Sequence, residues 1–102
     1  MEEKFDCPAQ QVLDLLGQKW TLMILRVINQ NKVQRFNEIY KALKPISPKT
    51  LSVRLEELEK KHIISKKVYN EIPPKVEYTL TKEGNELIEC FKHIDKWVKK
   101  WK

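Results

Sequence analysis

The segment from residue 45 to residue 59, PISPKTLSVRLEELE, has the side chains best suited to binding a polyanion. Ser47 provides an N-cap hydroxyl for the free amides of a helix, and Pro48 fits the first helical position. Hydroxyls and helix amides bind phosphates, and longer donors reach base edges in a DNA groove. On this helix we expect Lys49, Ser52 and Val53 to face base edges, and Ser47, Thr50 and Arg54 to lie near the sugar-phosphate backbone.

The same segment also fits an ordinary amphipathic surface helix. Leu51, Leu55 and Leu58 follow at i, i+4 and i+7, which predicts one buried stripe. Capped helices with such a stripe are common in proteins of every function. The neighbouring segments therefore have to decide between the two interpretations.

A short helix is predicted just before this segment. Phe36, Ile39 and Leu43 have helical spacing, and the few residues that follow them leave only a tight turn. Two helices joined in this way form a helix-turn-helix, predicted here for residues 35–60, with the cation of Arg35 at its entrance. Helix pairs with short turns also occur in bundles that bind no DNA.

Beyond residue 61 the hydrophobic period changes from that of a helix to that of a strand. Residues 64–69 and 75–81 suit two strands, and the NEIPP sequence between them ends both, so a β-hairpin is predicted over 63–81. A basic hairpin behind a helix-turn-helix is a wing that grips the DNA backbone or minor groove. Charged strand residues are also commonly just solvated, which is the alternative. The wing cations are Lys66, Lys67 and Lys75.

The chain has 102 residues, a length typical of a single domain, and a net charge of +6. Residues 31–82 contain 12 Lys or Arg and 6 Asp or Glu, whereas the flanks contain 8 of each sign. A basic centre in a neutral scaffold is typical of a module that approaches a polyanion. No segment pairs a basic face with bulky exposed aromatics, so nucleic acid is favoured over a membrane surface as the partner.

Two helices are predicted within residues 7–30. The first opens at Cys7-Pro8 and ends at Gly17, with Val12, Leu13 and Leu16 on one face. The second is a central helix covered on two sides. Its main stripe is Trp20, Met23, Ile24, Val27 and Ile28, and Leu22 and Leu25 lie on its other side.

The last helix, within residues 82–102, is predicted to start at a Thr81 cap and to carry a heptad-like stripe. This stripe has more apolar surface than one small core covers, which predicts a homodimer. The alternative is that the helix folds back on the second helix of its own chain. On this helix the predicted interface consists of Leu87, Phe91, Ile94, Trp97, Val98 and Trp101.

Catalysis, cofactors and metal sites are not expected. The chain has no Gly-rich phosphate loop, and His62 and His93 lack the neighbours of a nucleophile-base pair. Cys90 and His93 are three residues apart, but two further metal ligands are missing. Without an apolar leader or an apolar run of roughly 18 residues, a cytoplasmic protein that does not enter a membrane is expected.

The sequence resembles the HxlR family of winged helix-turn-helix transcription regulators, which are related to the MarR type. The resemblance runs from Cys7-Pro8 through GQKWTLMIL, RFNEI, ISPKTLSVRLEELE and VYNEIPPKVEYTLTKEG to the region of Trp97. It implies a mainly α fold with a β-wing, and a homodimer that binds an inverted-repeat operator in double-stranded DNA. It also implies that the helix from Ser47 enters the major groove. It further implies that the first and last helices form the dimer, which adds Val12 and Leu13 to the predicted interface. The chain departs from the usual pattern at Gln18 and His62, where glycine often stands.

Cys7 lies at the mouth of the first helix, where the helix dipole favours a thiolate and Asp6 opposes it. The resemblance implies that Cys7 senses oxidants or electrophiles, as a cysteine at this position does in many family members. A small buried hydrophobe is the alternative. Cys90 is the candidate partner for a bridge between subunits. A small-molecule effector is also compatible with the sequence, and so is a winged helix that binds protein instead of DNA.

Overall fold

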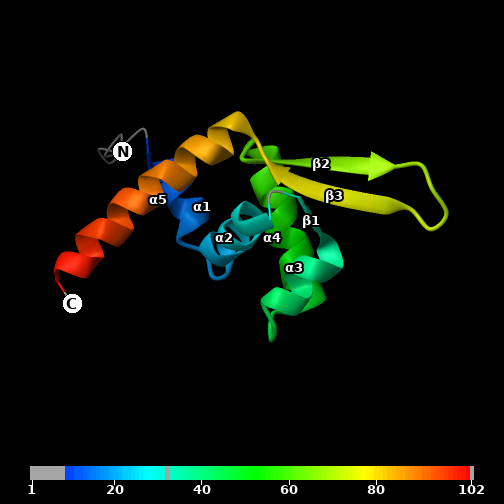
Figure 1. Ribbon diagram of the computed structural model, residues 1–102, viewed down its shortest axis with the longest axis horizontal. Helices are drawn as coiled ribbons and strands as arrows, with labels where there is room; N and C mark the ends of the chain where they lie inside the picture. The colour runs from blue at the N-terminus through cyan, green and yellow to red at the C-terminus, as the bar shows by residue number, and fades with distance from the viewer. Residues whose placement is uncertain (1–8, 32, 102) are drawn as a thin grey trace, which may run out of the picture.

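The computed structural model describes residues 9–31 and 33–101, and within them the chain forms five helices and three strands (Figure 1). The wing projects from one side of a group of helices, and the last helix projects from the opposite side. In chain order the elements are α1 (Gln10–Leu16), α2 (Thr21–Asn31), β1 (Gln34–Arg35), α3 (Phe36–Ala42), α4 (Pro48–Lys60), β2 (Ile64–Tyr69), β3 (Lys75–Leu80) and α5 (Lys82–Lys100).

The helix-turn-helix pair and the hairpin are found where the sequence predicts them. Ser47 caps α4, because its Oγ accepts a hydrogen bond from the Thr50 amide at 3.0 Å. Strands β2 and β3 pair antiparallel from Ile64 opposite Leu80 to Tyr69 opposite Lys75. The mainly helical winged fold is therefore confirmed.

The sheet has one strand more than the hairpin predicts. The strand order is β1-β3-β2, so β3 is central and β1 occupies its other edge. Periodicity could not reveal β1, because it has only two residues and both are polar. Gln34 is nonetheless buried, and its side-chain amide donates to the carbonyl oxygen of Val27 at 3.1 Å. Tertiary pairing therefore created this strand, since the local sequence has no strand pattern.

The core surrounds α2, but the buried stripe of this helix differs from the predicted one. Ile24, Leu25 and Ile28 are fully buried, whereas Met23 is 49% exposed. On the second side predicted to be covered, Leu25 is confirmed as core, whereas Leu22 is 39% exposed. The prediction of Met23 as a core residue is wrong. Trp20 precedes the helix and adopts a φ of 81°. In a helix covered from several directions, the hydrophobic period alone does not fix which side is covered most.

The N-terminal helix also differs from the prediction. The predicted start at Cys7-Pro8 lies outside the described residues, and α1 begins at Gln10. Leu15 is its buried residue, while Leu13 is 53% exposed. The face shared by Val12, Leu13 and Leu16 is therefore not the face that packs most deeply into the core.

The junction between the wing and α5 is tightly built. His62 adopts a left-handed φ of 62°, which explains why glycine suits this position. Thr81 caps α5 by accepting from the Gly84 amide at 3.0 Å, and its hydroxyl also lies within 3.0 Å of the Ile63 carbonyl oxygen. These contacts fix the direction in which α5 leaves the sheet.

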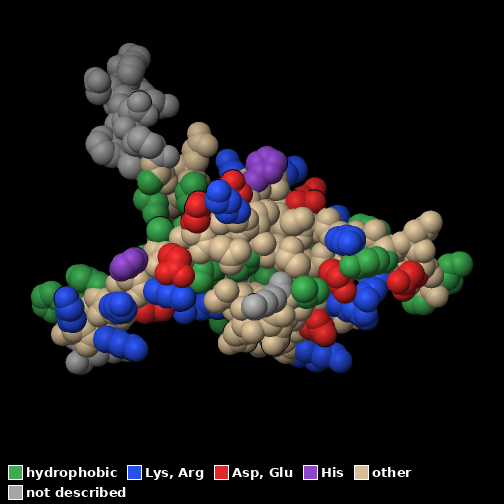
Figure 2. Space-filling view, turned by 45° about the horizontal axis from the view of Figure 1, so that its top comes forward, with side chains coloured by type: hydrophobic (Ala, Val, Ile, Leu, Met, Phe, Trp, Pro, Cys, Tyr) green, Lys and Arg blue, Asp and Glu red, His purple; other side chains and the backbone are tan. Residues whose placement is uncertain are grey.

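The two halves of α5 have different surroundings. Ile88 and Phe91 are buried in the core of their own chain, and Arg26 of α2 pairs with Asp95 at 3.0 Å. Beyond this point the helix carries exposed hydrophobic side chains, and Figure 2 shows such side chains gathered at the far end of α5. The first part of α5 therefore folds back on its own chain, whereas the part beyond Asp95 has an apolar face that none of the described elements of the chain covers. No helix in the described ranges is long and apolar enough to cross a membrane.

Candidate nucleic-acid interface

The exposed face of α4 presents the side chains that the sequence assigns to base edges. Lys49 and Ser52 are exposed and Val53 is 38% exposed, because Leu51, Leu55 and Leu58 turn the opposite face into the core. Ser47 is also exposed and donates from its hydroxyl to the Thr50 Oγ1 at 2.9 Å. The first turns of α4 thus present a polar surface with one cation, Lys49, on a helix whose opposite face packs into the core.

Arg54 is less free than its neighbours on α4. Its Nε donates to the carbonyl oxygen of Lys19 at 3.2 Å, and one terminal nitrogen pairs with Glu57 at 3.2 Å. The guanidinium has five N–H donors, so some remain for a phosphate. These contacts also tie α4 to the connection between α1 and α2, a structural role that the sequence did not reveal.

The three wing lysines do not share one face. Lys66 lies opposite Tyr78, and both line a small polar hollow of about 180 Å³ together with Ser52, Glu56 and Glu59 of α4. Burial raises the pKa of Tyr78, and the charge of Glu59 adds to this effect. Lys66 therefore lies on the side of the wing that faces α4, between the two elements predicted to meet DNA.

Lys67 and Lys75 lie on the other side of the sheet, and Arg35 joins them there. Lys67 is opposite Glu77 across β2 and β3, and Arg35 is opposite Glu77 across β1 and β3. The Tyr69 hydroxyl donates to Glu77 at 3.0 Å, and Lys75 pairs with Glu77 at 3.3 Å. The hydrogen bond from Tyr69, followed by the contact with Lys75 and the charge of Arg35, lowers the pKa of the Glu77 carboxyl.

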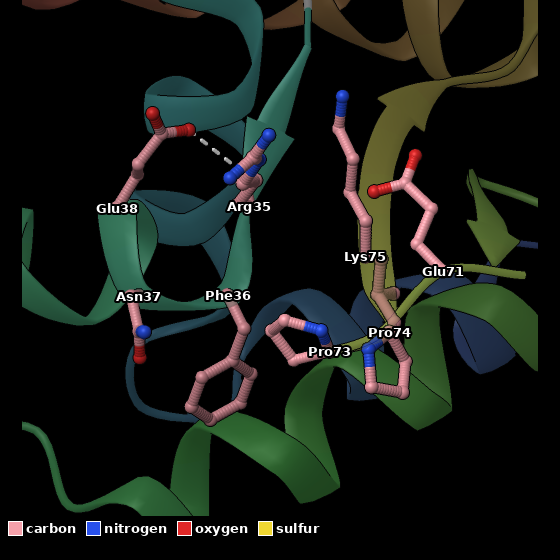
Figure 3. A pocket seen from close by; sticks show the side chains of 9 residues that line it. Arg35, Phe36, Asn37, Glu38, Glu71, Pro73, Pro74 and Lys75 are labelled. Carbon is pink, nitrogen blue, oxygen red and sulfur yellow. Dashed lines mark hydrogen bonds between the residues drawn. The ribbon is translucent and has the colours of Figure 1, made fainter. Parts of the chain in front are cut away.

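A cleft of about 600 Å³ opens between the start of α3 and the end of the wing (Figure 3). Figure 3 shows Arg35 on one wall and Lys75 on the other. Glu38 and Glu71 also line the cleft, and Glu38 accepts a hydrogen bond from the Arg35 backbone amide at 2.8 Å. Because two carboxylates balance the two cations, the cleft by itself does not concentrate positive charge.

Sequence reasoning missed the roles of Tyr69 and Glu77 in this interface. The signal was present, because the NEIPP turn fixes the register and thereby places Tyr69 opposite Lys75 and Lys67 opposite Glu77. The Cys7 prediction lies outside the described residues. Cys90 is a free, exposed thiol on α5, and no group of three or more His, Cys, Asp or Glu side chains in the described ranges could hold a metal ion.

A second surface lies between α1, α2 and α5. An apolar groove of about 280 Å³ is lined by Leu13, Leu16, Gly17, Leu22, Arg26, Phe91 and Ile94. It continues along α5 to Trp97, Val98 and Trp101, which are 59%, 36% and 73% exposed. The indole rings of the two tryptophans lie 5.9 Å apart. Leu87 is half-buried against the core, and Phe91, although predicted for the dimer interface, is only 6% exposed.

Comparison with known proteins agrees with this architecture. Residues 15–102 match the model of the HxlR-like helix-turn-helix family. The chain belongs to the HxlR family. The HTH-type transcriptional regulator YdeP of Bacillus subtilis is 38% identical over 96 residues, which cover 94% of this chain and 74% of YdeP. HxlR relatives of this kind are transcriptional regulators, so the prediction that the chain is not an enzyme is confirmed.

Two solved structures of regulators are similar to this chain in both fold and sequence. The reduced form of the transcriptional regulator YodB of B. subtilis has a TM-score of 0.81 and 37% identity, and the match covers 91% of each chain. The redox regulator HypR in its reduced form has a TM-score of 0.78 and 33% identity, with 92% of each chain covered. The chain is therefore a helix-turn-helix transcriptional regulator of a family that includes redox-responsive members.

Proposed function

We propose that the chain binds double-stranded DNA as a homodimer, at an operator that is an inverted repeat. The observation that carries this proposal is the exposed, Ser47-capped face of α4 beside a basic wing. Lys49, Ser52 and Val53 face base edges in the major groove. The backbone contacts come from Arg35, Ser47, Thr50, Arg54, Lys66, Lys67 and Lys75.

The homodimer rests on the uncovered apolar surface described above. The groove between α1, α2 and α5 and the exposed end of α5 together form one apolar face. A two-fold partner placed there would use the same face in both subunits. Two copies of α4 would then meet half-sites about 34–36 Å apart, or a multiple of that distance.

Selection from random duplex DNA at near-physiological salt tests this function. We expect the selection to recover an inverted repeat, and affinity for that repeat to fall steeply with added salt because phosphate contacts release counterions. A protein-binding winged helix, the competing function, would recover no sequence and would show no such salt dependence. The latter result would overturn the proposal.

Two substitutions separate the assigned roles. Lys49→Ala should change the selected sequence, because it removes a donor to base edges. Lys67→Ala should weaken all sequences alike and flatten the salt dependence by about one charge. Lys92 is an exposed residue of α5, outside the proposed DNA contacts, so Lys92→Ala is the matched control and should change neither property. If Lys67→Ala altered sequence preference without altering affinity, the assignment of the wing would be wrong.

We also propose that Cys7 makes DNA binding sensitive to oxidants. The similarity to YodB, which has been solved after diamide treatment, and to HypR, solved in reduced and oxidised forms, supports this role. Diamide should lower the operator affinity of the parent and leave Cys7→Ser unchanged. Cys90→Ser then tests the bridge between subunits, since Cys90 is exposed. Equal affinity of the parent before and after diamide would leave Cys7 with a structural role.

A further inference from the structure

One face of the three-stranded sheet carries three cations next to Glu77. Arg35, Glu77 and Lys67 lie side by side across β1, β3 and β2, and Tyr69 and Lys75 form the next pair along the hairpin. These side chains share a face because residues two apart in a strand point to the same side. Glu77 is the only carboxylate within β2 and β3, and it lies between these three cations.

Both carboxylate oxygens of Glu77 are occupied. Oε1 accepts from the Tyr69 hydroxyl at 3.0 Å, and Oε2 lies 3.3 Å from Lys75 Nζ. The same ammonium group lies 5.0 Å from the centroid of the Tyr69 ring. Side-chain exposure is 19% for Glu77 and 30% for Lys75. The Lys75 charge is therefore held by a carboxylate and by a ring face, in a partly desolvated position.

Lys67 differs from Lys75 in one respect. Its ammonium group also lies 5.0 Å from the Tyr69 centroid. Within the described ranges, however, Lys67 forms no ion pair, and it is exposed. Lys67 can thus meet a phosphate with its charge unbalanced, whereas the charge of Lys75 is already balanced by Glu77.

We propose that Glu77 is an internal counterion that holds Lys75 in the place of a DNA phosphate. The wing then contributes Lys67, and not Lys75, to the sequence-independent contacts with the backbone. Glu77 is a positioning residue that limits how strongly the wing binds any duplex, and it thereby increases the share of the affinity that depends on bases read by α4. This inference rests on the proposed DNA-binding function, and it removes Lys75 from the set of backbone contacts.

The salt dependence of binding measures this directly. Each phosphate that a cation neutralises adds about 0.9 to the slope of log affinity against log salt. Releasing Lys75 from Glu77 would add one such contact. Between 50 and 200 mM salt, the affinity of the released form would then fall by about 3.5-fold more than that of the parent.

Two variants and a control complete the experiment, with a duplex of random sequence as the ligand. Glu77→Gln keeps an acceptor for Tyr69 but removes the charge, and should steepen the slope by about 0.9. Lys75→Ala combined with Glu77→Gln should return the slope to the parent value. Glu89→Gln breaks the exposed Glu89–Lys92 pair, at 3.1 Å on α5, and makes the same change in net charge. It should leave the slope unchanged.

Other outcomes overturn the inference. If Lys75 already binds a phosphate in the parent, Glu77→Gln will match the parent and the double variant will be flatter by about 0.9. Equal steepening by Glu77→Gln and Glu89→Gln would show an effect of net charge alone, and equal slopes for all variants would show that Lys75 meets no phosphate. Failure of the parent to bind any duplex would instead refute the proposed function. Circular dichroism spectra check that all variants are folded.

Discussion

At position 84, only a hydrogen atom fits between α5 and the base of the wing. A Cβ on Gly84 would lie 2.2 Å from the backbone carbonyl oxygen of Ile63, which cannot move without disturbing the sheet. Gly84→Ala should therefore lower the free energy of unfolding by about 1–3 kcal/mol, as overpacking does elsewhere. Urea unfolding measures this. Gly17→Ala is the control, because its nearest contact would be 3.2 Å and its φ is −76°, so a much smaller change is expected.

The Glu77 carboxyl links the stability of the wing to pH. Its pKa lies below the ordinary value of 4.5, first because of the Tyr69 hydrogen bond and then because of Lys75. A lowered pKa means that the folded protein binds fewer protons than the unfolded chain in this range. The stabilising contribution is therefore present above pH 4.5 and is lost as the pH falls through the lowered pKa.

Urea unfolding at a series of pH values tests this linkage. The free energy of unfolding should rise with pH through the acid range more steeply for the parent than for Glu77→Gln. Tyr69→Phe should have an intermediate effect, because it removes only the first cause of the shift. Parallel pH profiles for the parent and Glu77→Gln would contradict the assignment.

A side-chain hydroxyl caps the start of each of the two longest helices, α4 and α5, but the two hydroxyls make different contacts. Ser47 caps the exposed start of α4, so Ser47→Ala should cost about 1 kcal/mol of stability. Thr81 caps α5 and also contacts the carbonyl oxygens of His62 and Ile63. Thr81→Ala should therefore cost more than Ser47→Ala in thermal or urea unfolding, and Thr81→Ser should recover most of the loss. Equal costs would mean that only the cap matters at Thr81.

The connection between α4 and β2 depends on the backbone conformation of one residue, His62. His62 ends the path from α4 at a φ of 62°, its amide donates to the Glu59 carbonyl at 3.0 Å, and its own carbonyl accepts from Thr81. A non-glycine residue pays a steric cost in this region. The junction is nevertheless held from both sides, which explains how histidine is accommodated where glycine is the more permissive choice.

For the whole molecule, the uncovered end of α5 predicts the oligomeric state. Trp97→Ala combined with Trp101→Ala removes the largest exposed apolar side chains and should yield monomers with weak operator binding. Light scattering measures the mass. Ile72→Ala is the matched control, because Ile72 is fully exposed at the wing tip, away from α5, and should leave the mass unchanged. A double variant with the mass of the parent would refute this interface.

Several features of this protein were determined by the sequence alone, because they depend on local chemistry. Ser47 before Pro48 fixed the start of α4, and the NEIPP turn fixed the hairpin. The leucine stripe of α4 fixed which face carries Lys49 and Ser52. Each of these three features follows from capping, turn geometry or helical spacing, and none of them needs a distant partner.

The remaining features needed the tertiary structure, because residues far apart in the chain decide them. Gln34 became a strand residue only by pairing with Tyr78. Met23 is 49% exposed whereas Leu25 is buried, because the elements packed around α2 decide which of its sides is covered most. Pairing of β1 with β3 also placed Arg35 beside Glu77, on the face that carries Lys67 and Lys75. Composition counts Lys75 as one more cation of a basic centre. Only the packed sheet shows that its charge is already held by a neighbour.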